Sequence, residues 1–236
     1  MAGPPRILAM GGASLLPSST DGALHQHLLD LTGQARPRIC FVGTPSGDNA
    51  ESLATFYAAF ARRAEPTHLA LFDRRVGDLT AFLLEQDIVY VGGGNTANAL
   101  AIWRTHGLDR ALKTAWESGV ILAGPSAGAN CWFEASTSDS FGPEIHALRD
   151  GLRFLKGSFC PHYDSESLRR PRYHELVGSG ELPDGYAADD GVALLFEGRE
   201  LAEVVASLPG SSAFRVERRR GNQVEETPIR ARAIRP

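Results

Sequence analysis

The sequence predicts an α/β fold, a three-layer sandwich in which helices cover both faces of a mostly parallel central sheet. Short apolar runs alternate with amphipathic segments through the first half of the chain, as strands alternate with helices in parallel sheets. Several of these runs end directly in glycine, which permits tight turns at the C-terminal edge of such a sheet. The 236 residues, 43% of them hydrophobic, are expected to form a single domain, 1–236.

Five strands are predicted in the first half of the chain, at residues 6–10, 38–43, 68–72, 87–91 and 120–123. The helices expected between them cover residues 21–31, 50–63, 79–84, 97–105 and 108–118. In the first of these helices, Leu24, Leu28 and Leu31 recur at helical spacing, so they would line one buried face.

The second half of the chain is less regular. Short strands are predicted at 151–154 and 156–160, a short helix at 172–177, and a further strand at 190–196. Residues 214–219 alternate apolar and charged side chains, as a half-exposed antiparallel strand does. The arginine-rich tail, 218–235, is expected to be a solvated edge, since glutamates partly offset its charge.

Composition excludes several classes of protein. The net charge of −4 gives no reason to expect a nucleic acid or an anionic membrane as partner. No apolar run approaches the roughly 18 to 20 residues that span a bilayer, and the first residues lack the apolar core of a signal peptide. Cys40, Cys131 and Cys160 are too scattered for a disulfide framework or a metal site. We therefore expect a cytoplasmic protein with reduced thiols, no metal and no cofactor.

Ser126 lies where the strand 120–123 ends, within Gly124-Pro125-Ser126-Ala127-Gly128. This is the G-x-S-x-G pattern of a nucleophile elbow, a sharp strand-to-helix turn that exposes a serine hydroxyl above the sheet edge. A helix starting after it would direct free N–H groups at an anion formed there. The alternative is a plain glycine-rich turn with a bystander serine.

A serine nucleophile needs a base, and His162 is the candidate among seven histidines. It directly follows a short apolar strand, and Pro161 restricts the backbone before it; a purely structural histidine is the alternative. The base in turn needs an orienting carboxylate. Four aspartates are candidates, each of which would otherwise be a turn-forming residue: Asp139, Asp164, Asp189 and Asp190.

Backbone N–H groups would complete such a site as an oxyanion hole. One donor is Ala127, the residue after the serine. A second is Gly93 or Gly94, because a glycine turn lets backbone approach a substrate carbonyl closely. The segment 92–96 fits neither the dinucleotide fingerprint nor the P-loop spacing, which disfavours nucleotide binding.

Three segments together resemble the aspartyl dipeptidase (peptidase E) and cyanophycinase family of serine peptidases. They are Val91-Gly92-Gly93-Gly94-Asn95-Thr96, Gly124-Pro125-Ser126-Ala127-Gly128-Ala129-Asn130 and Pro161-His162-Tyr163. Their order and separations agree with the family, and the resemblance covers nearly the whole chain. It implies a fold like that of class I glutamine amidotransferases, with the serine as nucleophile, the histidine as base, and Gly93, Gly94 and Ala127 as oxyanion donors.

The resemblance also indicates the acid and the specificity residues. The family's acidic residue is a glutamate before a strand; Asp190 matches that place with a side chain one methylene shorter, and Asp139, near another acidic position, is the second choice. Arg169 matches an arginine that faces the carboxylate of an N-terminal aspartate in the substrate, and Asn95 is expected to contact substrate too. Alternatively, the arginines around Arg169 form a solvated cluster that Glu166 and Glu175 neutralise.

The function that the resemblance implies is a metal-independent serine dipeptidase for Asp-Xaa, so its partner is a small peptide substrate. Alternatives are a cyanophycinase-like or isoaspartyl peptidase, a peptidase of broader N-terminal specificity, and a binding protein that has lost turnover. A glutamine amidotransferase is disfavoured because Cys131 and Cys160 are misplaced for the elbow. The sequence does not determine the oligomeric state; a homodimer is compatible with it.

Overall fold

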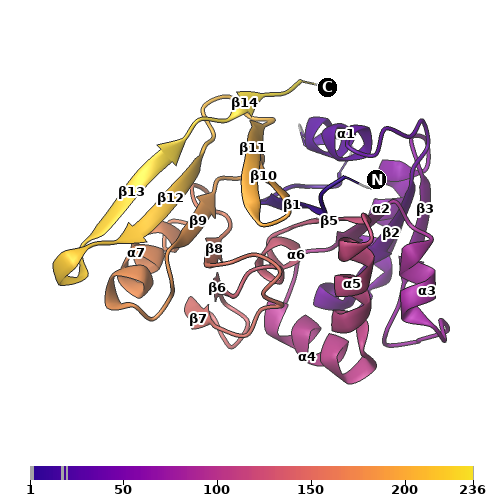
Figure 1. The fold of residues 1–236 in the computed structure, drawn as a ribbon, viewed down its shortest axis with the longest axis horizontal. Helices are drawn as coiled ribbons and strands as arrows, with labels where there is room; N and C mark the ends of the chain where they lie inside the picture. The colour runs from indigo at the N-terminus through magenta and orange to yellow at the C-terminus, as the bar shows by residue number, and fades with distance from the viewer. Residues whose placement is uncertain (1–2, 17–18, 20, 236) are drawn as a thin grey trace.

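The computed structural model describes residues 3–16, 19 and 21–235. A mixed sheet of eight strands forms the body of the protein, and a second sheet of six strands lies beside it (Figure 1). In sheet order the main sheet contains β14 (Arg232–Ala233), β11 (Glu200–Ala206), β10 (Val192–Glu197), β1 (Arg6–Met10), β5 (Ile121–Pro125), β4 (Ile88–Val91), β2 (Arg38–Val42) and β3 (Glu65–Leu69). The prediction of an α/β fold is confirmed.

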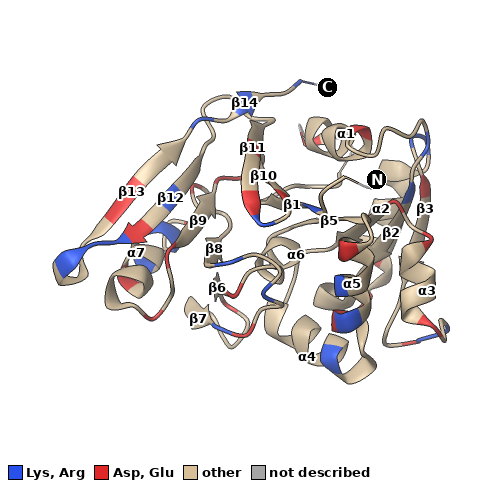
Figure 2. Cartoon of the chain, viewed as in Figure 1, with Lys and Arg blue, Asp and Glu red and all other residues tan. Residues whose placement is uncertain are grey.

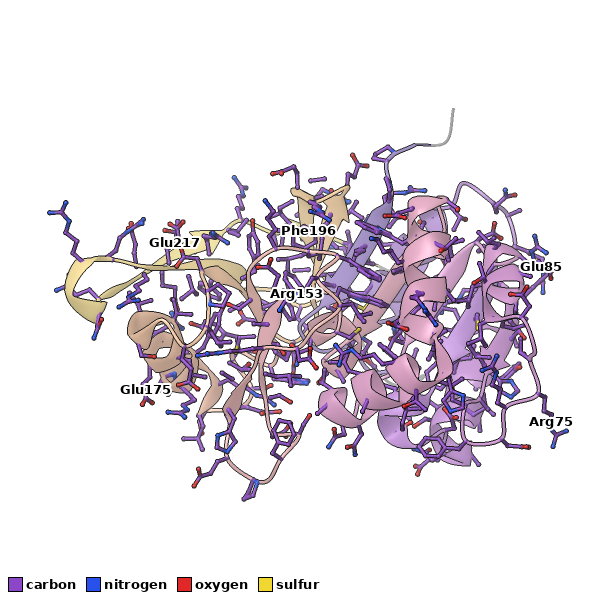
Figure 3. All side chains as sticks on the ribbon, turned by 60° about the horizontal axis from the view of Figure 1, so that its bottom comes forward. Arg75, Glu85, Arg153, Glu175, Phe196 and Glu217 are labelled. Atoms are coloured by element: carbon purple, nitrogen blue, oxygen red, sulfur yellow. The ribbon has the colours of Figure 1, made fainter. Side chains whose placement is uncertain are left out.

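The second sheet was not predicted as a unit. Its order is β13 (Val224–Ile229), β12 (Ala213–Arg218), β9 (Gly185–Ala188), β8 (Ser158–Cys160), β6 (Ala135–Ser138) and β7 (His146–Leu148). Phe196 of β10 joins the two sheets, because its ring centroid lies 5.6 Å from that of Tyr186 on β9 and 5.7 Å from that of Phe133. Figure 3 labels this buried side chain in the middle of the molecule.

Parallel pairing dominates the main sheet. Strands β1, β5, β4, β2 and β3 pair in parallel, while β10 is antiparallel to both β1 and β11. The C-terminal ends of β1, β4 and β5 therefore meet at one edge, so the glycine turns that follow them lie near one another. This edge carries the candidate site described below.

Helices cover both faces of the main sheet (Figure 1). They are α1 (Gly22–Asp30) and α2 (Ala50–Phe60) on one face, and α3 (Leu79–Leu84), α4 (Thr96–His106) and α5 (Leu108–Glu117) on the other. Successive side chains of a strand point to opposite faces. Leu8 of β1 accordingly packs in the core that contains Phe56, whereas Ile7 packs in the core that contains Trp103.

Local signals set the start of three of these helices. The side chains of Asn49, Asp78 and Asn95 accept hydrogen bonds from the first-turn N–H groups of α2, α3 and α4. Such caps satisfy donors that the helix itself leaves without partners. Gly107, with φ 76°, ends α4 and allows α5 to begin at the next residue.

Two predicted strands are wrong in place or in kind. The strand expected at 68–72 is β3 at Glu65–Leu69, because Asp48 Oδ2 accepts the N–H groups of Leu71 and Phe72 and holds that stretch in a turn. The strand expected at 151–154 does not form. The N–H groups of Gly151 and Leu152 donate instead to carbonyls of the turns that follow Ser126.

The helix expected at 172–177 is longer and forms α7 (Arg169–Ser179). The arginine-rich tail contains β13, an edge strand that pairs antiparallel with β12. Figure 2 shows acidic and basic residues interspersed along this hairpin, and Arg219 pairs with both Glu217 and Glu225. None of the helices in the described part of the chain is long and apolar enough to cross a membrane.

Candidate active site

Ser126 stands at a sharp bend between β5 and the short helix α6 (Ala127–Asn130). Its backbone has φ 55° and ψ −115°, a conformation that residues with a side chain rarely adopt. A Cβ atom added to Gly124 or Gly128 would lie 2.2 Å from the carbonyl oxygen of Val91 on β4. The two glycines are therefore required by close packing against β4, and this packing fixes the bend that leaves Ser126 half-buried at the sheet edge.

The glycine turn after β4 lies against this bend. A Cβ atom built on Gly93 would be 3.8 Å from the Cβ atom of Ser126. Gly94, with φ 131°, packs so tightly on Pro45 that a Cβ atom there would lie 2.3 Å from the Pro45 carbonyl oxygen. Within the described residues, the N–H groups of Gly93 and Ala127 donate to no protein acceptor. Both groups are thus free to donate to an atom bound beside Ser126.

His162 follows β8 and also has a strained backbone, with φ 53°. Its N–H donates to the Gly11 carbonyl, and the N–H of Tyr163 donates to the carbonyl of Ala188, so the chain is held on both sides of the strained residue. The imidazole Nδ1 lies 2.7 Å from Oδ1 of Asp190. The imidazole is therefore oriented by a carboxylate.

Asp190 is placed by the turn between β9 and β10. Its N–H donates to Oδ1 of Asp164, and the next N–H, of Gly191, donates to the Gly12 carbonyl. The hydrogen bond from His162 lowers the pKa of Asp190; burial opposes this shift, and a hydrogen bond from Ser165 adds to it. Asp190 is therefore ionised beside the imidazole at neutral pH.

Gly12, which the sequence analysis did not select, supports this pair. A Cβ atom at position 12 would lie 1.9 Å from Oδ1 of Asp190 and 2.9 Å from Nδ1 of His162. Only glycine fits there without moving both side chains. The Gly11-Gly12 pair at the end of the first strand indicates a turn in the sequence. Nothing in the sequence indicates that this turn lies beside residues 162 and 190.

The other candidate carboxylates have different partners. Asp139 Oδ2 lies 3.8 Å from Nη2 of Arg169. Asp164 accepts the N–H of Asp190, and Asp189 accepts the N–H of Ser212; burial is the main cause that raises the pKa of Asp189. Among the four aspartates, Asp190 is the one whose carboxylate contacts His162 in the described structure.

Arg169 is the first residue of α7 and is only 3% exposed, so it is not part of a solvated cluster. Its Nε lies 2.6 Å from Oε2 of Glu166. Glu166 and Asp139 are thus the two carboxylates that face the guanidinium within the described residues. Nη1 is nevertheless buried and has no hydrogen-bond partner within the described part of the chain. Glu175, the other acid considered, pairs with Arg172 instead.

Asn95 has a structural role in this structure. Its Oδ1 caps α4 by accepting the Asn98 N–H, and its Nδ2 lies 2.9 Å from the Ser140 carbonyl oxygen. Both ends of the side-chain amide are therefore engaged, so contact with a substrate would need one of these hydrogen bonds to break.

A cluster of four side chains behind His162 was also missed by the sequence analysis. Glu226 of β13 accepts hydrogen bonds from Tyr163, Arg170 and His174. The Arg170 guanidinium lies 5.3 Å from the centroid of the Tyr163 ring. This cluster fastens the residue after His162 to the hairpin of the second sheet, a contact between positions 63 residues apart that no local pattern indicates.

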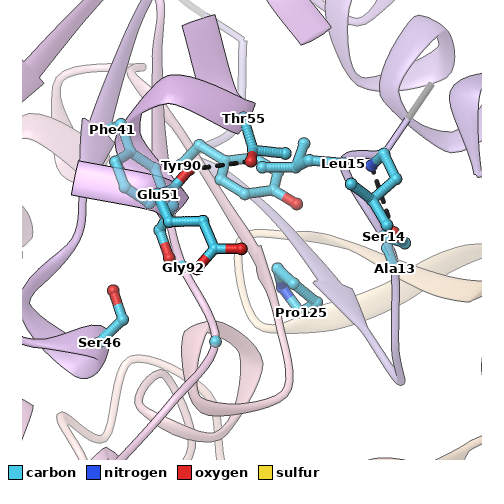
Figure 4. Close-up of a pocket in the computed structure, with 13 residues that line it drawn as sticks. Ala13, Ser14, Leu15, Phe41, Ser46, Glu51, Thr55, Tyr90, Gly92 and Pro125 are labelled. Carbon is cyan, nitrogen blue, oxygen red and sulfur yellow. Dashed lines mark hydrogen bonds between the residues drawn. The ribbon is translucent and has the colours of Figure 1, made fainter. Parts of the chain in front are cut away.

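Two adjoining cavities lie at this edge of the sheet, each of about 270 Å³. Pro125 and Gly93, the neighbours of Ser126, line the first; His162 and Asp190 line the second. Ala13 and Ser14 line both. Figure 4 shows residues that line the first cavity, among them Pro125, Gly92 and Tyr90. The described residues contain no group of three or more His, Cys, Asp or Glu side chains arranged to hold a metal ion.

Comparisons with known proteins agree on one family. The model of peptidase family S51 matches residues 7–204. The uncharacterized peptidase YgaJ of Bacillus subtilis is 47% identical over 212 residues, which cover 89% of this chain and 91% of that protein. Among solved structures, a peptidase from an acI-B1 Actinobacterium has a TM-score of 0.69 at 16% identity, over 97% of this chain and 95% of that one. A putative peptidase E protein from Listeria monocytogenes has a TM-score of 0.56 at 14% identity, over 96% and 100%.

Proposed function

Because the chain belongs to peptidase family S51, the family of peptidase E and the cyanophycinases, we propose that it is a serine peptidase with Ser126, His162 and Asp190 as its catalytic triad. One observation carries the proposal. The 2.7 Å contact between Nδ1 of His162 and Asp190 leaves Nε2 of the same ring available as a base. The strained bend at Ser126 supports a nucleophile elbow in a fold of the class I glutamine amidotransferase type.

The proposed reaction proceeds through an acyl-enzyme. Nε2 of His162 takes the proton of Ser126 Oγ while that oxygen bonds to the carbonyl carbon of the substrate. The N–H groups of Ala127 and of Gly93 or Gly94 then stabilise the negative charge on the former carbonyl oxygen. When the C–N bond breaks, His162 returns the proton to the leaving amine. A water molecule, activated by the same imidazole, hydrolyses the ester and regenerates Ser126.

The proposed substrates are short peptides with an N-terminal aspartate, foremost Asp-Xaa dipeptides. The unpartnered Nη1 of the buried Arg169 supports this choice, since a guanidinium binds a carboxylate through parallel N–H donors. A second candidate is a peptidase of broader N-terminal specificity. The pairing of Arg169 with Glu166 and Asp139 favours it, because these carboxylates already offset the charge that would select an acidic substrate. The proposed site of action is the cytoplasm, where the three free cysteines stay reduced.

Hydrolysis of Asp-Leu, Glu-Leu and Ala-Leu by the full chain tests both the serine mechanism and the preference for an N-terminal aspartate. Ser126→Ala should abolish turnover of every dipeptide and abolish labelling by a fluorophosphonate probe. Ser118→Ala, a serine change on an exposed helix end, should leave both unchanged. A kcat/KM for Asp-Leu at least tenfold above that for Ala-Leu supports the aspartate preference, and equal values favour the broader peptidase. Near-normal hydrolysis by Ser126→Ala would refute the serine mechanism.

A further inference from the structure

The cavity that adjoins Ser126 on the side of β4 carries a single formal charge. Glu51, in the first turn of α2, is the one acidic residue that lines it, and no lysine, arginine or histidine does so within the described residues. Tyr90 also lines it, but burial raises the pKa of its phenol, so the group stays neutral. The electrostatic field of this cavity is therefore that of one carboxylate, which favours a cation.

The Glu51 carboxylate differs from the other two carboxylates of the adjoining cavities because it has no partner among the described residues. Asp190 is hydrogen-bonded to His162, and Asp21 accepts from the N–H of Ser14 and from two serine hydroxyls. Within the described part of the chain, the Glu51 carboxylate accepts no hydrogen bond and pairs with no cationic side chain; the Thr55 hydroxyl donates instead to the backbone carbonyl of Glu51. Figure 4 shows its side chain directed into the cavity, toward Gly92.

The position of the cavity relates this charge to the chemistry at Ser126. Pro125 and Gly93 line it; Pro125 is covalently next to Ser126, and a Cβ atom built on Gly93 would lie 3.8 Å from the Cβ atom of Ser126. When a peptide is cut after its first residue, the free α-ammonium group is two bonds from the carbonyl carbon that Ser126 attacks. A dipeptide thus has a cationic end near the nucleophile, and its anionic end belongs to the leaving residue.

We infer that Glu51 binds the free α-ammonium group of the substrate and thereby restricts the enzyme to cleavage after an unblocked first residue. The inference rests on the proposed serine peptidase function. It adds the residue that would make the enzyme cleave only after the first residue of a peptide. The cavity, at about 270 Å³, admits the end of a chain, and a carboxylate with no other partner there supplies the acceptor that an ammonium group needs when it leaves water. A peptide with further residues before the cleaved one would place an uncharged amide, and not an ammonium group, beside the Glu51 carboxylate.

Binding to the Ser126→Ala protein tests this inference without hydrolysis. The probes are Ala-Leu with propanoyl-leucine, and Asp-Leu with succinyl-leucine; the second member of each pair lacks only the amine. Calorimetry should give a Kd at least tenfold lower for the amine-bearing member of each pair. In Ser126→Ala/Glu51→Gln this advantage should fall to about threefold or less, with the amine-free compounds bound as before. Ser126→Ala/Glu85→Gln, which changes an exposed acid at the outer edge of the protein, should retain it (Figure 3).

Four results would overturn the inference. They are no advantage of the amine in Ser126→Ala, an equal advantage after Glu51→Gln, equal weakening of both members of a pair by Glu51→Gln, and no measurable binding of either dipeptide. These outcomes are distinct from failure of the proposed function, which would appear as hydrolysis that survives Ser126→Ala. The glutamine should not unfold the helix, because Glu51 is exposed and the cap of α2 is supplied by Asn49.

Discussion

The imidazole of His162 and the carboxylate of Asp190 lie 2.7 Å apart, although 28 positions separate them in the chain. Three segments bring them together: the end of β8, the turn before β10, and Gly12 after β1. The contact between His162 and Asp190 therefore depends on packing between these segments, and substitutions within them should change kcat.

Asp190→Asn should lower kcat by roughly 10⁴-fold with little change in fold, because the amide no longer holds the imidazole in the tautomer that leaves Nε2 basic. Asp139→Asn is the matched comparison, since Asp139 is the rival carboxylate and lies near Arg169 instead. Its kcat should stay within about tenfold of the wild type. Steady-state kinetics with Ala-Leu and Asp-Leu measure both. A larger fall in kcat for Asp139→Asn than for Asp190→Asn would reverse the assignment.

Gly12→Ala should reduce kcat by about 100-fold, because the added methyl group would lie 1.9 Å from Oδ1 of Asp190 and must displace the pair. Gly22→Ala in α1 is the control: its methyl group meets nothing within 4 Å and should leave kcat unchanged. Thermal unfolding monitored by circular dichroism separates a local displacement from a general loss of structure. An active Gly12→Ala enzyme would contradict the tight packing.

Ser126→Gly should be more stable than Ser126→Ala by about 1 kcal/mol, although both proteins are inactive. Glycine adopts φ 55° and ψ −115° without the steric cost that any Cβ atom imposes, and this relief exceeds the entropy that glycine adds to the unfolded chain. Urea unfolding of the two variants gives the difference directly. Equal free energies of unfolding would mean that the bend at Ser126 stores no strain.

His25 should make the protein less stable in mild acid. Burial lowers its pKa from 6.5 to about 4, so between these values the unfolded chain binds a proton that the folded protein does not. The stability that the neutral, buried His25 contributes is fully present above pH 6.5 and is lost as the pH falls toward 4. The free energy of unfolding should decrease by roughly 3 kcal/mol over this range.

Urea unfolding at pH 7 and pH 4.5 measures this contribution. In His25→Gln the decrease in the free energy of unfolding between these pH values should be smaller than in the wild type. Tyr90→Phe is the control: it removes the hydroxyl 3.3 Å from His25 Nε2 but keeps the titrating ring, so the decrease should persist. The prediction fails if His25→Gln and the wild type lose equal stability.

Glu166→Gln should increase the preference for an N-terminal aspartate. Glu166 lies 2.6 Å from Nε of Arg169, and its neutralisation leaves the buried guanidinium with one fewer anionic partner. The KM for Asp-Leu should fall by about fivefold while that for Ala-Leu stays constant. A fivefold change corresponds to about 1 kcal/mol, the free energy that one partly exposed ion pair contributes. Arg169→Met should remove any preference. Parallel changes in KM for both dipeptides would exclude Arg169 from substrate selection.

Local sequence determined the strands β1, β2, β4 and β5 and the helices between them, because strands that are buried on both faces of a parallel sheet appear as short continuous apolar runs. It also located Ser126, since Gly124 and Gly128 are both needed to pack a bend against Val91. Strand β3 was misplaced because a distant side chain, Asp48, binds the backbone that follows it.

Only the tertiary structure decided which residues meet. Four aspartates suited the same role by type and by position near a turn; the pairing of Gly12 with the turn at Asp190 determined which of them lies against His162. The same holds for the burial of Arg169: its pairing with Glu166, three residues away, is local, but its exposure of only 3% depends on the surrounding fold. The physical reason is that periodicity and turn chemistry act over a few residues, whereas a carboxylate is oriented by backbone contacts from strands far apart in the chain.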